Sequence, residues 1–223
     1  MYTLEQILQQ LVELNPNEVH NYRYAISIMY ILQYFPEAKS AYEVGERTNF
    51  TTVLERCMPE LTIYYSEGDI RKDIKLEVDK VDLVICMEVI EHLGDIPSDD
   101  ILTTATYTGS GIRGFLTNIK KYMTEESNLF ITTPNVISYR SIANTLYGVH
   151  PFCYNPHVRE LTPNDVQNFL VESGFQCIVK TETVWDHHRM SPQLVKTIQN
   201  FIKQLGFNET LRGDDIFVIA KLM

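Results

Sequence analysis

The first 36 residues carry two stripes of apolar side chains at helical spacing. Large apolar residues recur every three or four positions from Leu4 to Leu14, and again from Tyr24 to Phe35. Residues 15–17 (Asn-Pro-Asn) interrupt the pattern between the two stripes. Such stripes are typical of amphipathic helices that bury one face. We therefore expect two helices in residues 1–36, packed against a domain formed by residues 37–223.

Beyond residue 36, apolar runs of strand length alternate with amphipathic helical stretches. Strands are expected at residues 41–44, 61–66, 81–87, 128–133, 175–184 and 216–222. Helices are expected at residues 51–58, 112–123, 138–147, 163–173 and 191–206. The run VDLVICM at 81–87 is apolar almost throughout, which is typical of a parallel strand covered on both faces. The alternation predicts an α/β fold, with a mostly parallel sheet and helices on both of its faces.

This arrangement points to candidate binding residues, because ligands of open α/β sheets bind outside the carboxyl ends of the strands. The residues that follow the predicted strands are Gly45, Asp69, Glu88 and the pair Pro134–Asn135. The polar segment 94–111 is expected to be a long loop after the central strand. A loop of this length in a compact domain often has a function.

Charge and composition narrow the partners that the chain can bind. The formal net charge of −10 disfavours binding to a nucleic-acid backbone, which needs clustered basic residues. No apolar run approaches the roughly 20 residues that a membrane span needs. The start, MYTLEQILQQ, lacks the pattern of a signal peptide, so we expect a cytoplasmic protein. The four cysteines form no CxxC pair, which argues against a structural zinc site.

Four motifs stand in order near the predicted strand ends. They are EVGERTN at 43–49, DLVICMEVIEHL at 82–93, TTPN at 132–135, and HVRELTP at 157–163 followed by GF at 174–175. Together they resemble the class I S-adenosylmethionine-dependent methyltransferases, especially the branch with small-molecule and glycan-tailoring enzymes. The resemblance implies a Rossmann-like sheet, seven-stranded or shortened, with an antiparallel closing strand pair. It also implies S-adenosylmethionine as the cofactor.

In that family the turn after the first strand has the pattern E-x-G-x-G-x-G, whose glycines let the main chain approach the cofactor. Glu43 and Gly45 match this pattern, and Glu46 lies in the same turn. The resemblance implies that these three residues bind the cofactor. Arg47 and Asn49 replace the second and third glycines, and their side chains could crowd the cofactor. This departure leaves an alternative open, a methyltransferase-like binding subunit without catalytic activity.

The family also places an acidic residue after the second strand, where it accepts hydrogen bonds from the ribose. Asp69 is the first candidate for this role and Glu67 the second. Residues 67–70 (EGDI) also resemble the third-strand motif, and Asp69 lies only thirteen positions before Asp82. One α/β unit is therefore expected to be shortened. Met87 and Glu88 match the positions that border the adenosyl group.

Glu91, His92 and His157 are the catalytic candidates. Glu91 and His92 match positions at the mouth of the substrate pocket, where a histidine can take a proton from a substrate hydroxyl. Together with Glu88 and His157 they also resemble the metal-binding set of the small-RNA 2′-O-methyltransferases of the Hen1 type, which keeps a metal-dependent RNA enzyme as an alternative. We expect no metal, because the same motifs are common in relatives without one.

Aromatic residues and one arginine gather after Asn135, in a region that helps to cover the substrate in the family. They are Tyr139, Arg140, Tyr147, Phe152 and Tyr154. With residues 94–111 they are expected to form the acceptor pocket, whereas His187–His188 are interpreted as a surface pair. The expected function is methyl transfer to an oxygen, or a nitrogen, of a small-molecule or glycan-type acceptor, with a homodimer as one assembly to consider.

Overall fold

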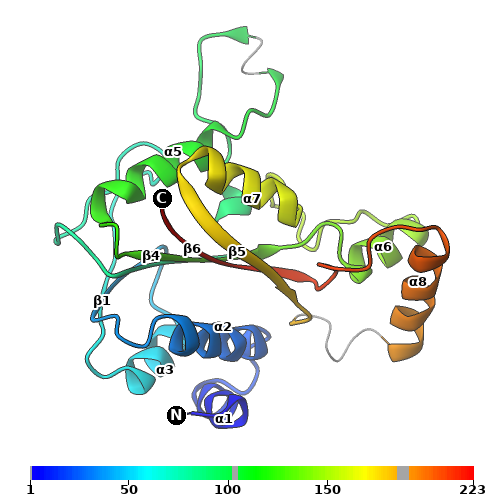
Figure 1. The fold of residues 1–223 in the computed structure, drawn as a ribbon, viewed down its shortest axis with the longest axis horizontal. Coiled ribbons are helices and arrows are strands. Elements are labelled where there is room, and N and C mark those ends of the chain that lie inside the picture. The colour runs from blue at the N-terminus through cyan, green and yellow to red at the C-terminus, as the bar shows by residue number, and fades with distance from the viewer. Residues whose placement is uncertain (1, 102–104, 185–190) are drawn as a thin grey trace.

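The computed structural model describes the whole chain except residues 1, 102–104 and 185–190. Its centre is a six-stranded sheet with the order β2-β1-β3-β4-β6-β5 (Figure 1). The strands are β1 (Ser40–Glu43), β2 (Thr62–Tyr64), β3 (Leu83–Met87), β4 (Asn128–Pro134), β5 (Phe175–Glu182) and β6 (Asp215–Leu222). The pairs among β2, β1, β3 and β4 are parallel, whereas β6 is antiparallel to both β4 and β5. The predicted α/β class and the antiparallel closing pair are confirmed.

In the described part of the chain the sheet has six strands, fewer than the seven of the complete pattern. Between β2 and β3, residues 65–82 form no strand and contribute only an isolated bridge between Glu67 and Lys75. The strand β2 is therefore the last at its edge of the sheet. The short spacing between Asp69 and Asp82 had indicated this loss, because so few residues cannot hold a helix, a strand and their connections.

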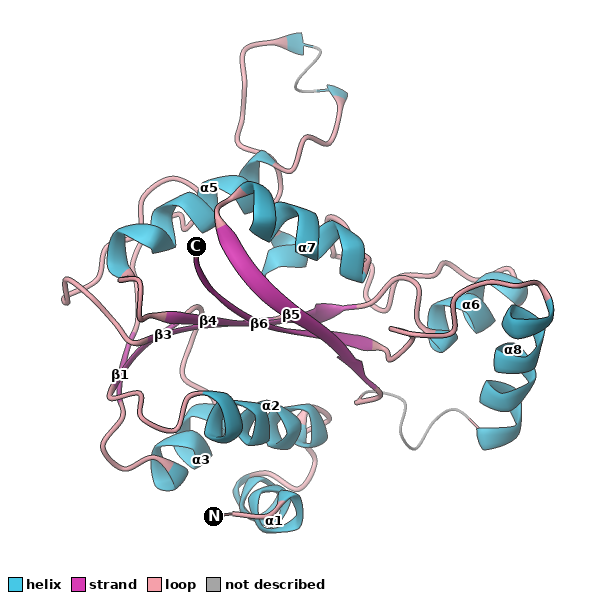
Figure 2. Ribbon diagram, viewed as in Figure 1, coloured by secondary structure: helices cyan, strands magenta, loops and turns pink. Residues whose placement is uncertain are grey.

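Helices cover both faces of the sheet (Figures 1 and 2). One face carries α1 (Leu4–Leu14), α2 (Asn21–Tyr34) and α3 (Asn49–Cys57), and the other carries α5 (Ser110–Ile119) and α7 (Pro163–Glu172). Two short 3₁₀ helices, η1 (Ile90–His92) and η2 (Lys120–Tyr122), follow β3 and α5, and α6 (Tyr139–Leu146) and α8 (Pro192–Gln204) lie beyond one end of the sheet. No helix of the described residues has the length and hydropathy needed to cross a membrane.

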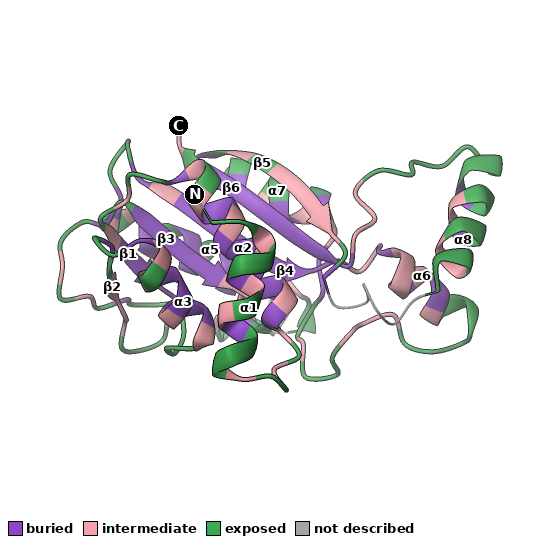
Figure 3. Ribbon diagram, turned by 90° about the horizontal axis from the view of Figure 1, so that it is seen from below, coloured by how far each residue is buried: buried purple, intermediate pink, exposed green. Residues whose placement is uncertain are grey.

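Side chains that alternate along the strands build one hydrophobic core on each face. On β3, Leu83 and Ile85 pack with the α1–α3 face, whereas Val84 and Cys86 pack with the opposite face. All four side chains are fully buried, and Figure 3 shows most of β3 and β4 in purple. A strand alternates its side chains between two faces, so a strand covered on both faces has to be apolar at every position. This explains the continuous apolar run in the sequence.

The N-terminal helices contribute to one of these cores. Ile7 and Leu11 of α1 and Ile28 and Ile31 of α2 are fully buried. Burying a side chain of this size stabilises a fold by roughly 1.5–3 kcal/mol, so these helices are an integral part of the packing. The first turn of α2 also lies against the end of β3, which brings the N-terminal segment to the candidate site described next.

Candidate active site

The site begins at an unusual backbone turn directly after β3. Glu88 has a φ of +55°, a conformation that is uncommon for any residue other than glycine and concentrates at functional sites. Its main-chain N–H donates to the Thr132 carbonyl at 2.9 Å, and the Thr132 hydroxyl donates to its carboxylate at 2.9 Å. These two bonds to β4 hold the turn and direct the chain into η1.

An arginine from the N-terminal helix α2 contacts the same carboxylate. Arg23 Nη1 lies 3.1 Å from Glu88 Oε1, and only 4% of Arg23 is exposed. Burial lowers the pKa of Arg23, while the charge of the buried Asp215 raises it. Arginine stays protonated under such conditions, so a buried positive charge faces the acidic end of β3. Arg23 was not predicted from the sequence, although polar residues on the apolar stripe of this helix were a signal for it.

Glu91 lies beneath the cavity with one unsatisfied oxygen. The residue is 1% exposed, and the Thr133 hydroxyl donates to its Oε2 at 2.8 Å. Its Oε1 has no hydrogen-bond partner among the described residues. Burial raises the pKa of Glu91 to about 7. A carboxyl group with a pKa near neutrality can both hold and release a proton at physiological pH.

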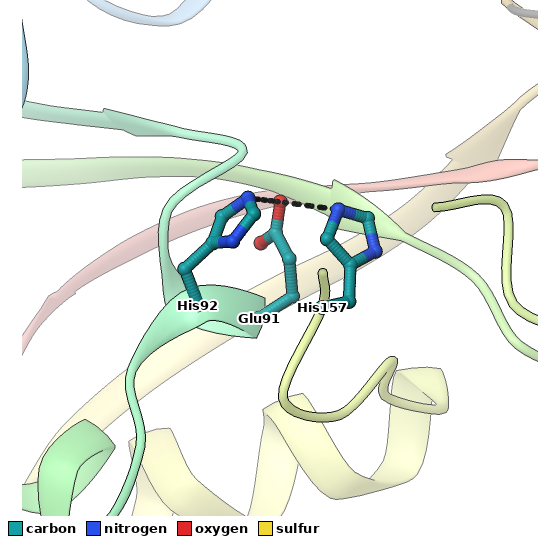
Figure 4. A group of neighbouring side chains, drawn as sticks. All are labelled: Glu91, His92 and His157. Carbon is teal, nitrogen blue, oxygen red and sulfur yellow. Dashed lines mark ion pairs between the residues drawn. The ribbon is translucent and has the colours of Figure 1, made fainter. Parts of the chain in front are cut away.

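Two imidazoles point at this unsatisfied oxygen (Figure 4). The Nε2 atoms of His92 and His157 each lie 4.0 Å from Glu91 Oε1. His157 Nδ1 is 2.7 Å from the buried carboxylate of Glu160, which fixes the ring and turns Nε2 toward Glu91. Burial and the neighbouring His157 lower the pKa of the half-exposed His92. His92 is therefore a neutral imidazole at physiological pH, which is the form that accepts a proton.

These groups open into a cavity of about 520 Å³. Of the candidates from the sequence, Glu88, His92 and His157 line it, together with Arg140 and Tyr154 of the expected acceptor region. The remaining lining residues were not predicted: Val19, His20, Arg23, Tyr24 and Cys153. Among the described residues of the segment 94–111, none lines this cavity, so the expected contribution of that loop is not found there.

The other aromatic candidates lie outside the cavity lining. Tyr147 is 72% exposed, and the Tyr139 hydroxyl donates to the Glu209 carbonyl at 3.3 Å. Phe152 packs edge-on against the ring of His150 at 4.7 Å. The pair His187–His188 lies outside the described residues.

The site also contains groups of the type that bind metal ions. Glu91, His92 and His157 offer three ligand atoms within 4.8 Å of one another, and so do Cys153, His157 and Glu160. Carboxylate and imidazole ligands suit several divalent ions. Glu88, the fourth member of the metal set seen in the sequence, belongs to neither group and is instead paired with Arg23.

The turn after β1 is open despite its arginine and asparagine. Gly45 has a φ of +118°, and a Cβ atom added there would meet nothing within 4 Å. The Arg47 guanidinium points away and pairs with the Glu55 carboxylate, with Nη1 2.8 Å from Oε1. Asn49 is the first residue of α3. Neither replacement fills the space beside Gly45, so bare main chain is accessible at this turn.

The buried side chain of Glu43 holds this turn in place through hydrogen bonds. Its carboxylate accepts hydrogen bonds from the Thr51 hydroxyl at 2.8 Å and the Tyr65 hydroxyl at 2.9 Å. Burial raises the pKa of Glu43. The side chain thus joins the end of β1 to α3 and to the residue after β2, whereas Glu46 is exposed on the turn.

Asp69 and Glu67 lie in a different hollow from Glu88. The Asp69 carboxylate accepts from Arg71 Nε at 2.9 Å and from Nη2 at 2.8 Å, and these bonds lower the pKa of Asp69 to about 2. Asp69 and Glu67 line a depression of about 250 Å³ with Lys72 and Lys75. Met87 is half-buried and packs on the α1–α3 core. Cofactor contacts by these residues stay predictions.

No model of a known protein family matches the chain, and no curated protein matches it. Solved structures do. A SAM-dependent methyltransferase from Archaeoglobus fulgidus is 17% identical with a TM-score of 0.52, over 91% of this chain and 96% of that one. The plantazolicin methyltransferase BpumL, solved with SAH, is 12% identical with a TM-score of 0.55, over 98% and 90%. The small RNA methyltransferase HEN1 is 12% identical with a TM-score of 0.51, but the match spans only 25% of its chain.

These identities are too low to transfer an activity, but the matches span nearly the whole chain and agree in fold. The strand order and the closing antiparallel pair described above are consistent with a Rossmann-like methyltransferase fold. The chain has the fold of the class I S-adenosylmethionine-dependent methyltransferases.

Proposed function

We propose that the protein is a cytoplasmic S-adenosylmethionine-dependent methyltransferase that methylates an oxygen of a small-molecule or sugar-containing acceptor. The observation that carries this proposal is the open turn at Gly45, which leaves main chain accessible although two glycines of the family pattern are replaced. The free thiols of all four cysteines support a reducing compartment.

The proposed cofactor supplies a methyl group that is already activated on a sulfonium. The main chain at Gly45 and Glu46 would receive the methionine part, and Met87 and Glu88 would border the adenosyl group. Asp69 is the first candidate to bind the ribose hydroxyls of the adenosine. Its carboxylate oxygens would then accept hydrogen bonds from these hydroxyls as well as from Arg71. Little more than alignment is needed from the protein, because holding the acceptor in line with the methyl group provides much of the rate.

His92 is the proposed proton acceptor. Its pKa is lowered and its side chain is 42% exposed to the cavity, so a neutral imidazole meets the acceptor. When bound, the cofactor would supply its methyl group to the acceptor oxygen and would retain the electron pair of the carbon–sulfur bond. The acceptor proton would pass to His92, whose Nε2 lies 4.0 Å from the Glu91 carboxylate. When ionised, that carboxylate stabilises the resulting imidazolium.

The cavity supports a small acceptor. Its volume of about 520 Å³ lies in the range of pockets for small molecules. Tyr24 and Tyr154 provide aromatic faces for a ring, and Arg140 provides hydrogen-bond donors for an oxygen-rich group. The net charge of −10 disfavours a nucleic acid.

Calorimetric titration with S-adenosylhomocysteine tests this proposal most simply. We expect saturable binding of the wild-type protein, and unchanged binding in Arg47→Ala, because that side chain points away from the turn. Absence of both heat and thermal stabilisation at millimolar ligand would overturn the proposal and favour the non-catalytic alternative.

A further inference from the structure

One projection of the molecule has surface features that the proposed function does not explain. The helices α6 and α8 form a small unit beyond one end of the sheet (Figure 1). It has a core of its own, made by Ala143, Ile198 and Ile202. We call residues 139–149 and 191–207 the α6–α8 lobe. Because α6 directly follows β4, the lobe lies at the carboxyl edge of the sheet, beside the candidate site.

The outer surface of this lobe is unusually apolar. Its own small core leaves six large hydrophobic side chains that are each more than half exposed, and Figure 3 shows α8 largely in the colour of exposed residues. They are Leu146, Tyr147, Val149, Phe201, Leu205 and Phe207. Single exposed apolar residues need no explanation, but a group of this kind on one projection marks an interaction surface.

The charge of the lobe is opposite to that of the rest of the chain. Within its two segments there is no Asp or Glu, whereas Arg140, Lys196 and Lys203 are basic. The whole chain has 19 basic and 29 acidic residues, so the remainder has 16 basic and 29 acidic residues and a net charge of −13. A basic, apolar projection on an acidic protein fits a partner that is both negatively charged and apolar.

We propose that the α6–α8 lobe docks the protein on an anionic lipid bilayer. Amphipathic helices with basic residues and large apolar side chains bind at such surfaces, where apolar burial and attraction to anionic head groups add. A nucleic acid offers little apolar surface on which aliphatic side chains such as Leu146 and Val149 could be buried. A second copy in a two-fold contact would place the basic lobes against each other.

The docking is peripheral. The helix α8 has 13 residues, which at about 1.5 Å per residue reaches only about 20 Å, short of the roughly 30 Å of a bilayer core. Arg140 belongs to the lobe and also lines the cavity of the candidate site. Docking through the lobe therefore places the mouth of that cavity near the lipid head groups, whatever reaction takes place there.

Vesicle co-sedimentation of the full chain tests this proposal. We expect binding to vesicles of phosphatidylcholine with 30% phosphatidylglycerol that is at least tenfold stronger than to phosphatidylcholine alone, and that weakens with added salt. Each basic residue near an anionic surface contributes about fivefold to binding. The double variant Lys196→Glu with Lys203→Glu should thus bind at least ~25-fold more weakly, and Phe201→Ser with Leu205→Ser should also lose binding.

Matched controls lie elsewhere on the surface. Lys121→Glu and Val171→Ser change an exposed lysine and an exposed valine outside the lobe, and both should bind like the wild type. Because Lys196 and Lys203 are exposed, their charge variant tests the proposal even where the apolar variant fails to fold. Equal binding to both vesicle types, no sedimentation at millimolar lipid, or equal losses in the controls would overturn it. A dimer in light scattering that Phe201→Ser with Leu205→Ser abolishes would instead assign the surface to a second copy.

Discussion

Replacing Glu91 with glutamine removes a buried carboxyl group whose ionisation opposes folding. Burial raises its pKa from 4.5 to about 7. Between these two pH values the native state therefore keeps a proton that the unfolded chain has released. Below pH 4.5 both states hold this proton, so the raised pKa does not lower the free energy of unfolding. The cost grows as the pH rises from 4.5 to 7 and is complete above 7. A pKa difference of one corresponds to about 1.4 kcal/mol, so the cost at pH 8 is on the order of 3 kcal/mol.

The Glu91→Gln variant should therefore gain stability over the wild type as the pH rises. The glutamine carbonyl can still accept the Thr133 hydroxyl, so packing and hydrogen bonding change little. For a domain of this size 1 kcal/mol shifts Tm by about 2–4 °C, so the Tm advantage of the variant should be roughly 5–10 °C larger at pH 8 than at pH 5. Thermal melts followed by circular dichroism at both pH values measure this difference.

A surface glutamate provides the matched control. Glu77 is exposed, and Glu77→Gln should shift Tm by the same small amount at both pH values. The reasoning about Glu91 is refuted if its variant shows no pH-dependent advantage, or if glutamine destabilises the protein at pH 8. Either result would mean that the native state holds Glu91 ionised without cost.

Further predictions concern the turn, the buried arginine and metal dependence. Gly45→Val should weaken S-adenosylhomocysteine binding at least tenfold in calorimetry, because its φ of +118° strains a β-branched residue, whereas Arg47→Ala should leave Kd within twofold. In urea unfolding Arg23→Met should cost on the order of 2 kcal/mol, since it removes the buried guanidinium that pairs with the partly buried Glu88, while the exposed Arg56→Met should cost less than about 0.5 kcal/mol. Methyl transfer should be unchanged by EDTA; a loss that Mn²⁺ restores would instead identify the group around His157 as a metal centre.

The sequence predicted the fold well because its strongest signals were long and periodic. The apolar run ending at Met87 matched β3. The helix expected at residues 163–173 matched α7, which Thr162 and Asp165 cap in a reciprocal capping box. The missing strand could be anticipated from the short interval between Asp69 and Asp82. The identity of the lost strand could not be predicted, because the segment EGDI at 67–70 resembles both the second-strand and the third-strand motif of the family.

The candidate site was only partly predictable, because much of it depends on contacts between distant segments. Glu88, Glu91 and His92 are close in sequence and leave one strand end together, so their grouping needed no tertiary information. The approach of Arg23 depends on how α2 crosses the sheet, and no pattern within a helix specifies this crossing. Similarly, the bonds between Asp69 and Arg71 follow from local turn geometry that composition does not reveal.

The central claim is that an adenosyl amino acid binds against the open main chain that follows β1. A crystal structure of the complex with S-adenosylhomocysteine tests it most directly. The account predicts density for the amino acid part along the main chain of Gly45 and Glu46, with the sulfur directed toward the cavity of His92. Density at any other place, or a turn in which Arg47 has moved over Gly45 and closed the space, would contradict it.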